Sequence, residues 1–127
     1  MEIKIGNLSK TIMQELGIFE QDVVDGLNEA GDKIAKAGAK KLRQVSPKKS
    51  GDYAKGWTVK TEKEFRKPTK YTIHNKNRPW LAHLLEKGHA TRDGGRTNPI
   101  VHIAPVEEEI VGEYMQMVED VIKRGGK

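Results

Sequence analysis

The feature that most constrains the fold is a long amphipathic segment over residues 18–45. Its apolar side chains recur close to the 3.6-residue period of a helix, at Phe19, Val23, Leu27, Ala30, Ile34, Leu42 and Val45. With a rise of about 1.5 Å per residue, this pattern predicts a helix roughly 40 Å long. Ser46-Pro47 should end it, because the residue before a proline is disfavoured in the α-helical region. Three glycines inside the segment indicate either close backbone packing or a break into two helices: Gly26, Gly31 and Gly38.

The segments on either side of this helix are shorter. Residues 7–16 are predicted to form a short helix with Asn7 as N-cap and Gly17 as its stop, and residues 1–6 are expected to be a flexible N-terminus. After the long helix, "KGWTVKTEKEF" and "RKPTKYTIHN" alternate polar residues with β-branched or aromatic ones. These two segments predict a β-hairpin with one apolar face on the long helix.

Two further helices are predicted towards the C-terminus. Pro79 opens a short helix, "WLAHLLEKG", whose leucines are expected to pack inward and which Gly88 closes. The last helix follows Ala104-Pro105 and carries acidic residues at its start and basic residues at its end. Its apolar stripe should face the core and consists of Val106, Ile110, Tyr114, Met117 and Val121.

A polar, glycine-rich loop separates these two helices, over about residues 90–98. We expect it to be mobile, because no apolar side chain in it can offset the entropy of ordering. Its central residues are the candidate assembly-interface loop: Arg92, Asp93, Gly94, Gly95 and Arg96.

The predicted fold class is therefore α+β, with a long N-terminal helix and a C-terminal helix packed on a small antiparallel β-sheet. The 127 residues are long enough for a single domain, residues 1–127, with a modest core. The absence of cysteine excludes disulfides, thiolate metal sites and cysteine nucleophiles. No apolar run is long enough to predict a membrane span.

The candidate ligands of a metal site are His83, Glu86, His89 and His102. The spacing is not that of His-Glu-x-x-His, and Gly88 is expected to end the helix before His89. The favoured interpretation is that Glu86 and the histidines satisfy backbone groups of the loop by hydrogen bonds. Ser46 and Ser50 lie in turn-like sequence, and no phosphate-binding loop is present. The sequence predicts no enzyme, no metal and no cofactor.

Nucleic-acid binding is the main alternative. The net charge is +5, but 18 acidic residues are interleaved with 23 basic ones, which is typical of a solvated surface. Basic residues gather at the end of the long helix and in the hairpin, and Trp57, Tyr71 and Trp80 are candidates for base stacking. No recognition helix, zinc finger or RNA-binding aromatic signature accompanies them.

Three motifs occur in an order that resembles the tail-component family of long-tailed bacteriophages, the head–tail joining or tail-completion proteins. The first is "KKLRQVSPKKSGDYAKGWTV", the second is "YTIHN" followed by "LAHLLEKGH", and the third is "GGR" leading to "HIAPVEEE" and the final helix. Eight residues of these motifs are expected to be structural: Pro47, Gly51, Leu85, Glu86, Gly88, His89, His102 and Pro105.

The resemblance implies a structural protein of the virion, made in the bacterial host cytoplasm and placed at the head–tail junction. It implies a monomer when free and a homo-oligomeric ring, six-fold, on assembly. The expected partners are further copies of the chain and the neighbouring connector and tail proteins, with incidental contact with DNA and none with membrane. The segments around Glu86 and His102 would then bracket a loop that leaves the globular body and returns to start the last helix.

Overall fold

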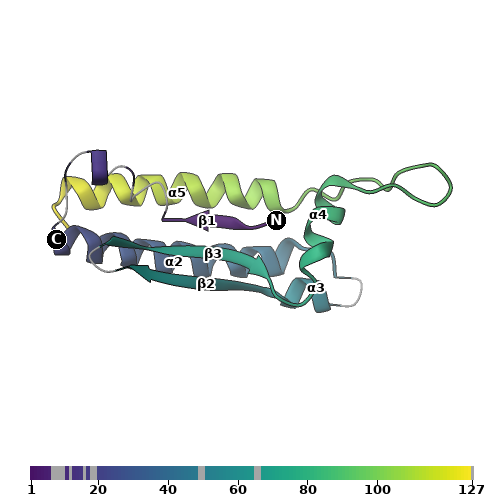
Figure 1. The fold of residues 1–127 in the computed structure, drawn as a ribbon, viewed down its shortest axis with the longest axis horizontal. Helices are drawn as coiled ribbons and strands as arrows, with labels where there is room; N and C mark the ends of the chain where they lie inside the picture. The colour runs from purple at the N-terminus through teal and green to yellow at the C-terminus, as the bar shows by residue number, and fades with distance from the viewer. Residues whose placement is uncertain are drawn as a thin grey trace.

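The computed structural model describes residues 1–6, 11, 13–15, 17, 20–48, 51–64 and 67–126. Along the chain the elements are β1 (Ile3–Ile5), α2 (Gln21–Val45), α3 (Asp52–Lys55), β2 (Trp57–Glu64), β3 (Lys67–Asn75), α4 (Pro79–Lys87) and α5 (Ile103–Lys123) (Figure 1). The short helix predicted over residues 7–16 lies mostly outside the described residues, as do Asn7 and Phe19; Thr11 and residues 13–15 are helical. The predicted α+β class is confirmed.

The sheet has three antiparallel strands in the order β1-β3-β2. The predicted hairpin is β2 and β3, and one inward row runs across the sheet from Ile3 through Ile73 to Val59. The third strand differs from the expectation of a flexible segment over residues 1–6. Ile3 and Ile5 are buried on either side of an exposed Lys4, so this short segment gains both an apolar face and a pairing edge.

Helices α2 and α5 pack on each other and cover the apolar face of the sheet (Figure 1). The helical period in α2 arises because its buried residues form one stripe, which includes two of the glycines. A Cβ at Gly31 would meet the Tyr71 ring at 2.5 Å, and one at Gly38 would meet Ile73 and Ile110 at 2.8 Å. The glycines therefore mark close packing and not a break.

The opposite face of the sheet is polar. Exposed or half-buried side chains alternate with buried ones along β3, and the outer face presents Lys4, Lys60, Thr72 and His74 beside Glu2 and Glu62. Such alternation is typical of an antiparallel sheet with one solvated face.

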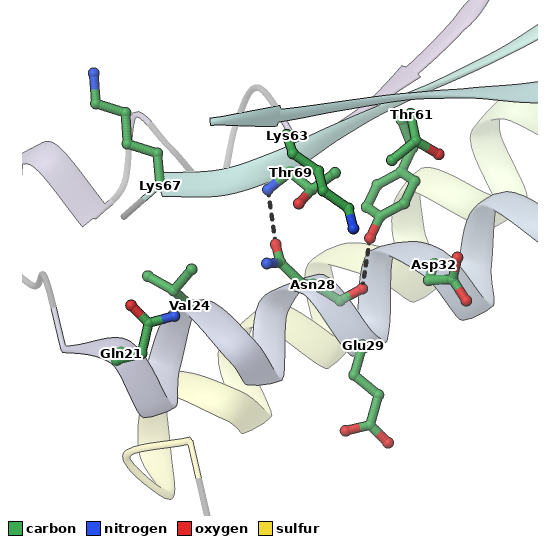
Figure 2. Close-up of a pocket in the computed structure, with 10 residues that line it drawn as sticks. Gln21, Val24, Asn28, Glu29, Asp32, Thr61, Lys63, Lys67 and Thr69 are labelled. Carbon is green, nitrogen blue, oxygen red and sulfur yellow. Dashed lines mark hydrogen bonds between the residues drawn. The ribbon is translucent and has the colours of Figure 1, made fainter. Parts of the chain in front are cut away.

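A groove lies between the first turns of α2 and the far end of the hairpin (Figure 2). Asn28 of α2 holds the strand there, since its side-chain oxygen accepts from the Thr69 N–H at 2.7 Å and its backbone carbonyl accepts from the Tyr71 hydroxyl at 2.9 Å. Burial, and then the nearby Asp32 carboxylate, raise the pKa of Tyr71 and keep this hydroxyl a donor. The polar groups of the groove thus fasten the hairpin to the helix.

The predicted stripe of α5 faces the core. Val106, Ile110, Tyr114 and Val121 are buried and Met117 is partly buried. The expectation for the leucines of α4 is met in part. Leu85 is partly buried and packs against the core, but the residues that this helix buries fully are Ala82 and Glu86, and Leu84 is only half-buried. Ala82 and Glu86 lie one turn apart on the inner face, and Leu85 lies about 100° around the axis from Glu86.

Because Ile110 is buried and Leu85 is only partly buried, truncating these two side chains should have different effects on stability. We expect Ile110→Ala to lower the free energy of unfolding by about 2–5 kcal/mol, because a buried methyl-rich side chain leaves a cavity. Leu85→Ala should lower it less, because part of that side chain is already in water. Denaturant titration of both variants measures the difference, and a near-neutral Ile110→Ala would contradict the placement of the core.

Candidate functional site

A projecting arm, residues 88–101, leaves the body after α4 and returns at the start of α5 (Figure 1). Its outer part is a small hairpin: the Thr97 N–H donates to the His89 carbonyl and the Thr91 N–H donates to the Gly95 carbonyl, both at 2.9 Å. Gly94 closes the turn with a φ of +83°, a conformation that glycine adopts without strain. The loop predicted between the two helices is present, and its mobility remains a prediction.

The tip of the arm is exposed and basic. Arg92, Asp93 and Arg96 all lie in water, and Asp93 is the only acidic residue between Lys87 and Pro105. The Arg96 guanidinium donates to the Gly88 carbonyl at 3.2 Å, whereas no partner of Arg92 is found within the described residues. Arg92 is therefore an exposed cation at the tip that is open to a partner.

The root of the arm, by contrast, is closely packed. Gly88 ends α4 with a φ of +74°, and a Cβ there would lie 2.6 Å from the Thr97 carbonyl oxygen. On the returning side, the Ile100 N–H donates to the Leu85 carbonyl at 2.7 Å. Both sides of the arm are thus joined to the last turn of α4.

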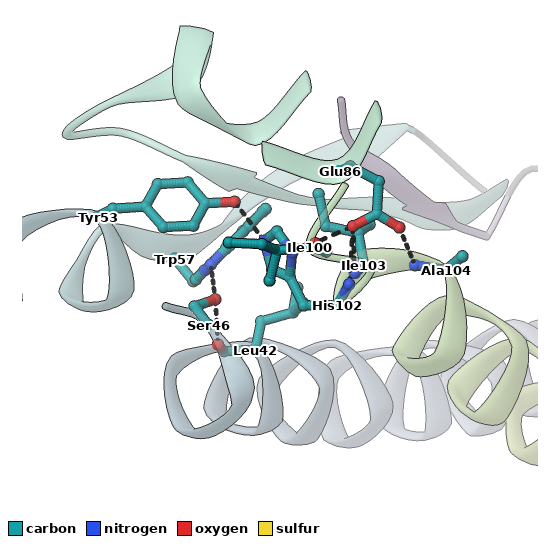
Figure 3. Close-up of polar contacts among 9 residues, drawn as sticks. All are labelled: Leu42, Ser46, Tyr53, Trp57, Glu86, Ile100, His102, Ile103 and Ala104. Atoms are coloured by element: carbon teal, nitrogen blue, oxygen red, sulfur yellow. Dashed lines mark hydrogen bonds and ion pairs between the residues drawn. The ribbon is translucent and has the colours of Figure 1, made fainter. Parts of the chain in front are cut away.

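Glu86 caps the N-terminus of α5 from α4 (Figure 3). One carboxylate oxygen accepts from the N–H groups of His102 and Ile103 at 2.8 and 2.9 Å, and the other accepts from Ala104 at 3.0 Å. The fourth position of the helix start is Pro105, which has no N–H. Since a helix leaves its first four N–H groups without a partner in the helix, this start is fully satisfied. The carboxylate also faces the positive end of the helix dipole.

His102 extends this contact to α3. Its Nδ1 lies 2.7 Å from the Ile100 carbonyl and 3.1 Å from Glu86, and its Nε2 lies 2.7 Å from the Tyr53 hydroxyl. Both neighbours of Nδ1 are acceptors, so Nδ1 carries a proton, and Nε2 is left to accept from Tyr53. Burial and then the Glu86 charge raise the pKa of Tyr53, which keeps the hydroxyl protonated. Tyr53, His102 and Glu86 together clamp α3, α4, the arm and α5.

The end of α2 is fixed beside this clamp (Figure 3). The Trp57 indole N–H donates to the Ser46 hydroxyl at 2.8 Å, and that hydroxyl donates to the Leu42 carbonyl. Ser46 is extended before Pro47, as predicted, and Gly51 has a φ of +81° before the short helix α3, where the sequence predicted only a turn.

The residues weighed as metal ligands are not brought together. His83 lies exposed on α4, Glu86 points at the start of α5, and His89 contacts Thr97 in the arm. No group of three or more metal-ligating side chains occurs in the part of the chain that the structure describes. Glu86 and His102 hydrogen-bond to backbone groups, as the sequence predicted, whereas the His89 ring contacts the Thr97 hydroxyl and not a backbone group.

The buried carboxylate has a consequence for the pH dependence of stability. Burial of Glu86 opposes its ionisation, but the three backbone donors and His102 outweigh burial and hold the pKa below its ordinary value of 4.5. A lowered native pKa stabilises the fold above the unfolded pKa, and this contribution is lost as the pH falls through the native pKa. We therefore expect the free energy of unfolding to fall below about pH 4.5 and Glu86→Gln to flatten that fall.

Urea titrations between neutral pH and pH 3 measure this effect, with Glu107→Gln as an exposed control on α5. The control should keep the wild-type pH dependence. An unchanged acid slope in Glu86→Gln would contradict the role of the carboxylate.

Several large apolar side chains on α4, the arm and the end of α2 are exposed. Trp80 is 55% exposed and Val101 59%, and Ile100 and Val45 are also exposed. In Figure 1, α4, the arm and the end of α2 lie at the same end of the molecule. Sequence reasoning missed this surface, because isolated apolar residues beside a polar loop give no periodic signal.

A model of a known protein family matches the part of the chain that contains α2, the hairpin and α4. The family model described as "Bacteriophage HK97-gp10, putative tail-component" matches residues 10–88, which is more than half of the chain. The chain belongs to this HK97-gp10-like family. The match runs from before α2 to the end of α4, so the arm beyond Gly88 and α5 lie outside it. No curated protein and no solved structure gives a significant match.

The HK97-gp10-like family is one of bacteriophage tail components, so the role of this protein is structural and its place is in the virion. None of the described helices is both long enough and apolar enough to cross a membrane. The predicted family is confirmed.

Proposed function

We propose that this tail component joins head and tail at the neck of the virion, as a tail-completion protein. It is a monomer when free and forms a homo-oligomeric ring, six-fold, between the connector and the tail proteins. It performs no chemistry and needs no cofactor. Contacts with DNA are incidental, and the protein is made in the bacterial host cytoplasm before it enters the particle.

The observation that carries this proposal is the arm on its fixed root. The tip, from Arg92 to Arg96, projects beyond the body, so it contributes almost no packing to the subunit's own stability (Figure 1). Its root is nevertheless clamped by buried polar contacts of Glu86 and His102. A segment that is held in place and packs on nothing is suited to contact another subunit.

Deleting the gene from the phage tests the proposal. Lysates should contain filled heads and separate complete tails, and adding purified protein should join them. Negative-stain images with a labelled antibody fragment should place the protein at the neck. Normal particles from the deletion, or label along the tail shaft or at its far tip, would contradict head–tail joining while leaving the family assignment intact.

Nucleic-acid binding is the alternative function, favoured by exposed Lys4 and Lys60 on the outer face of the sheet. Against it, Glu62 lies 3.6 Å from Lys60 on that face, and Trp57 and Tyr71 are buried in the core. Binding to duplex DNA through phosphates would weaken steeply between low and high salt. Tight binding with such a slope would favour the alternative.

A further inference from the structure

The outer face of α5 has acidic residues near the helix start. Glu107 and Glu108 are exposed, and no ion-pair partner for them is found within the described residues. The next residue, Glu109, is paired with Lys41 of α2. The face therefore offers negative charge that the subunit itself does not neutralise.

Gly112 lies in the middle of this face, and no close packing within the described part of the subunit requires a glycine there. Glycine in a helix interior is unfavourable compared with alanine, and the three glycines inside α2 make room for a neighbour. At Gly112 a Cβ would meet nothing within 4 Å. The missing side chain leaves a notch in the surface of the helix that a residue of another molecule can fill.

The notch opens into a groove that continues along α5 as far as Lys123. The groove has a volume of about 470 Å³, and Met115 and Ile122 contribute apolar surface to it. Val111, one turn before Met115, is 37% exposed beside it. Acidic residues at one end and apolar side chains along the groove define what can bind there: an extended segment with basic and small residues.

We propose that the arm of a second copy of this chain occupies this face of α5, with Arg92 against Glu108 and the glycine turn over Gly112. The proposal deepens the proposed function, on which it rests, by naming the contact between ring subunits. The tip carries Arg92 and Arg96 with Gly94 and Gly95 between them, so its charge and its small residues complement the face.

The reach of the arm is sufficient for this contact. From Gly88 to Thr91 the outgoing side of the arm advances three residues, roughly 10 Å at 3.3 Å per residue, before the turn over residues 92–94. This length is comparable with the diameter of about 10 Å of a helix with its side chains, so the tip can lie across α5.

The geometry also requires the neighbour to be another molecule. The arm points away from the body, whereas α5 of the same chain runs from the arm root in the opposite direction (Figure 1). The arm and the α5 face are different patches, so a head-to-tail contact between them can pass from subunit to subunit and closes into a ring if the rotation permits.

Charge reversal in the deletion phage tests the pairing. Arg92→Glu should abolish joining of tails to heads, and adding Glu108→Arg in the same chain should restore it. Glu113→Arg, an exposed acid about 140° further around the helix axis, is the matched control and should not restore joining. Equal rescue by both changes, or by neither, would overturn the proposal.

Disulfide trapping supplies a second readout, because the chain has no cysteine of its own. Particles carrying Thr91→Cys with Gln116→Cys should give a ladder of oxidised multimers, and Thr91→Cys with Lys60→Cys should not. A ladder only from the Lys60 pair would place the arm on the sheet of its neighbour and overturn the proposal. If the protein is found at the neck but neither pair crosslinks, the α5 contact is wrong and head–tail joining stands.

Discussion

Replacing Glu86 by alanine should strongly lower the free energy of unfolding of this protein. The change leaves the buried N–H groups of His102, Ile103 and Ala104 without their acceptor and removes the partner of His102 Nδ1. Leaving a buried donor without its acceptor typically costs about 1–3 kcal/mol. That loss is a large part of the usual total of about 5–15 kcal/mol for a small domain.

Chemical denaturation of Glu86→Ala at neutral pH measures this loss, and two variants control for it. Glu86→Gln keeps one carbonyl oxygen as an acceptor and should lie between wild type and alanine. Glu107→Ala removes an exposed acid from the same helix start and should change stability little. A loss in Glu86→Ala no greater than in Glu107→Ala would show that the capping contacts are not important for stability.

The double change Arg92→Glu and Arg96→Glu should leave the stability of the protein nearly unchanged but prevent assembly. Of the two arginines, Arg96 donates to the Gly88 carbonyl, and no partner of Arg92 is found among the described residues. The melting temperature of the purified protein should therefore stay nearly unchanged. In the complementation assay, joining of tails to filled heads should fall to the level of the gene deletion.

Two observations check the assumptions behind this prediction. Limited trypsin should cut first after Arg92 or Arg96 and leave the flanking helices intact, because exposed turns are preferred sites of proteolysis. A double change to glutamine at the same positions removes charge without reversing it and should impair joining less. Infectious particles at the wild-type yield from the glutamate variant would place the assembly contacts elsewhere on the molecule.

The parts of the fold that could be predicted from sequence are those with a local period. The helix α2 follows from the spacing of Val23, Leu27 and Ile34, and the hairpin follows from the alternation around Trp57 and Ile73. In both cases the same residues that set the period are the ones that the core buries.

The missed features depend on partners distant in sequence. The strand β1 is three residues long, and only its pairing with β3 makes it a strand. The acceptor role of Glu86 is similar: hydrogen bonding to the loop could be inferred from the residue type, but not that all three donors belong to the first turn of one helix. The motif residues Gly88, His102 and Pro105 were predicted as structural, and the geometry shows what each does.

The position of β1 bears on the order in which the chain acquires its structure. Ile3 pairs with Ile73, so this ladder closes a loop of more than half of the chain, whereas β2 and β3 are close neighbours in the sequence. The hairpin and α2 can form from local contacts, and the N-terminal strand must wait for them. Until it arrives, β3 presents an unpaired edge with Tyr71 and Ile73 beside it, the kind of edge through which chains aggregate. A strand of only three residues therefore serves as the cover that completes the sheet and protects the newly made subunit before it reaches the particle.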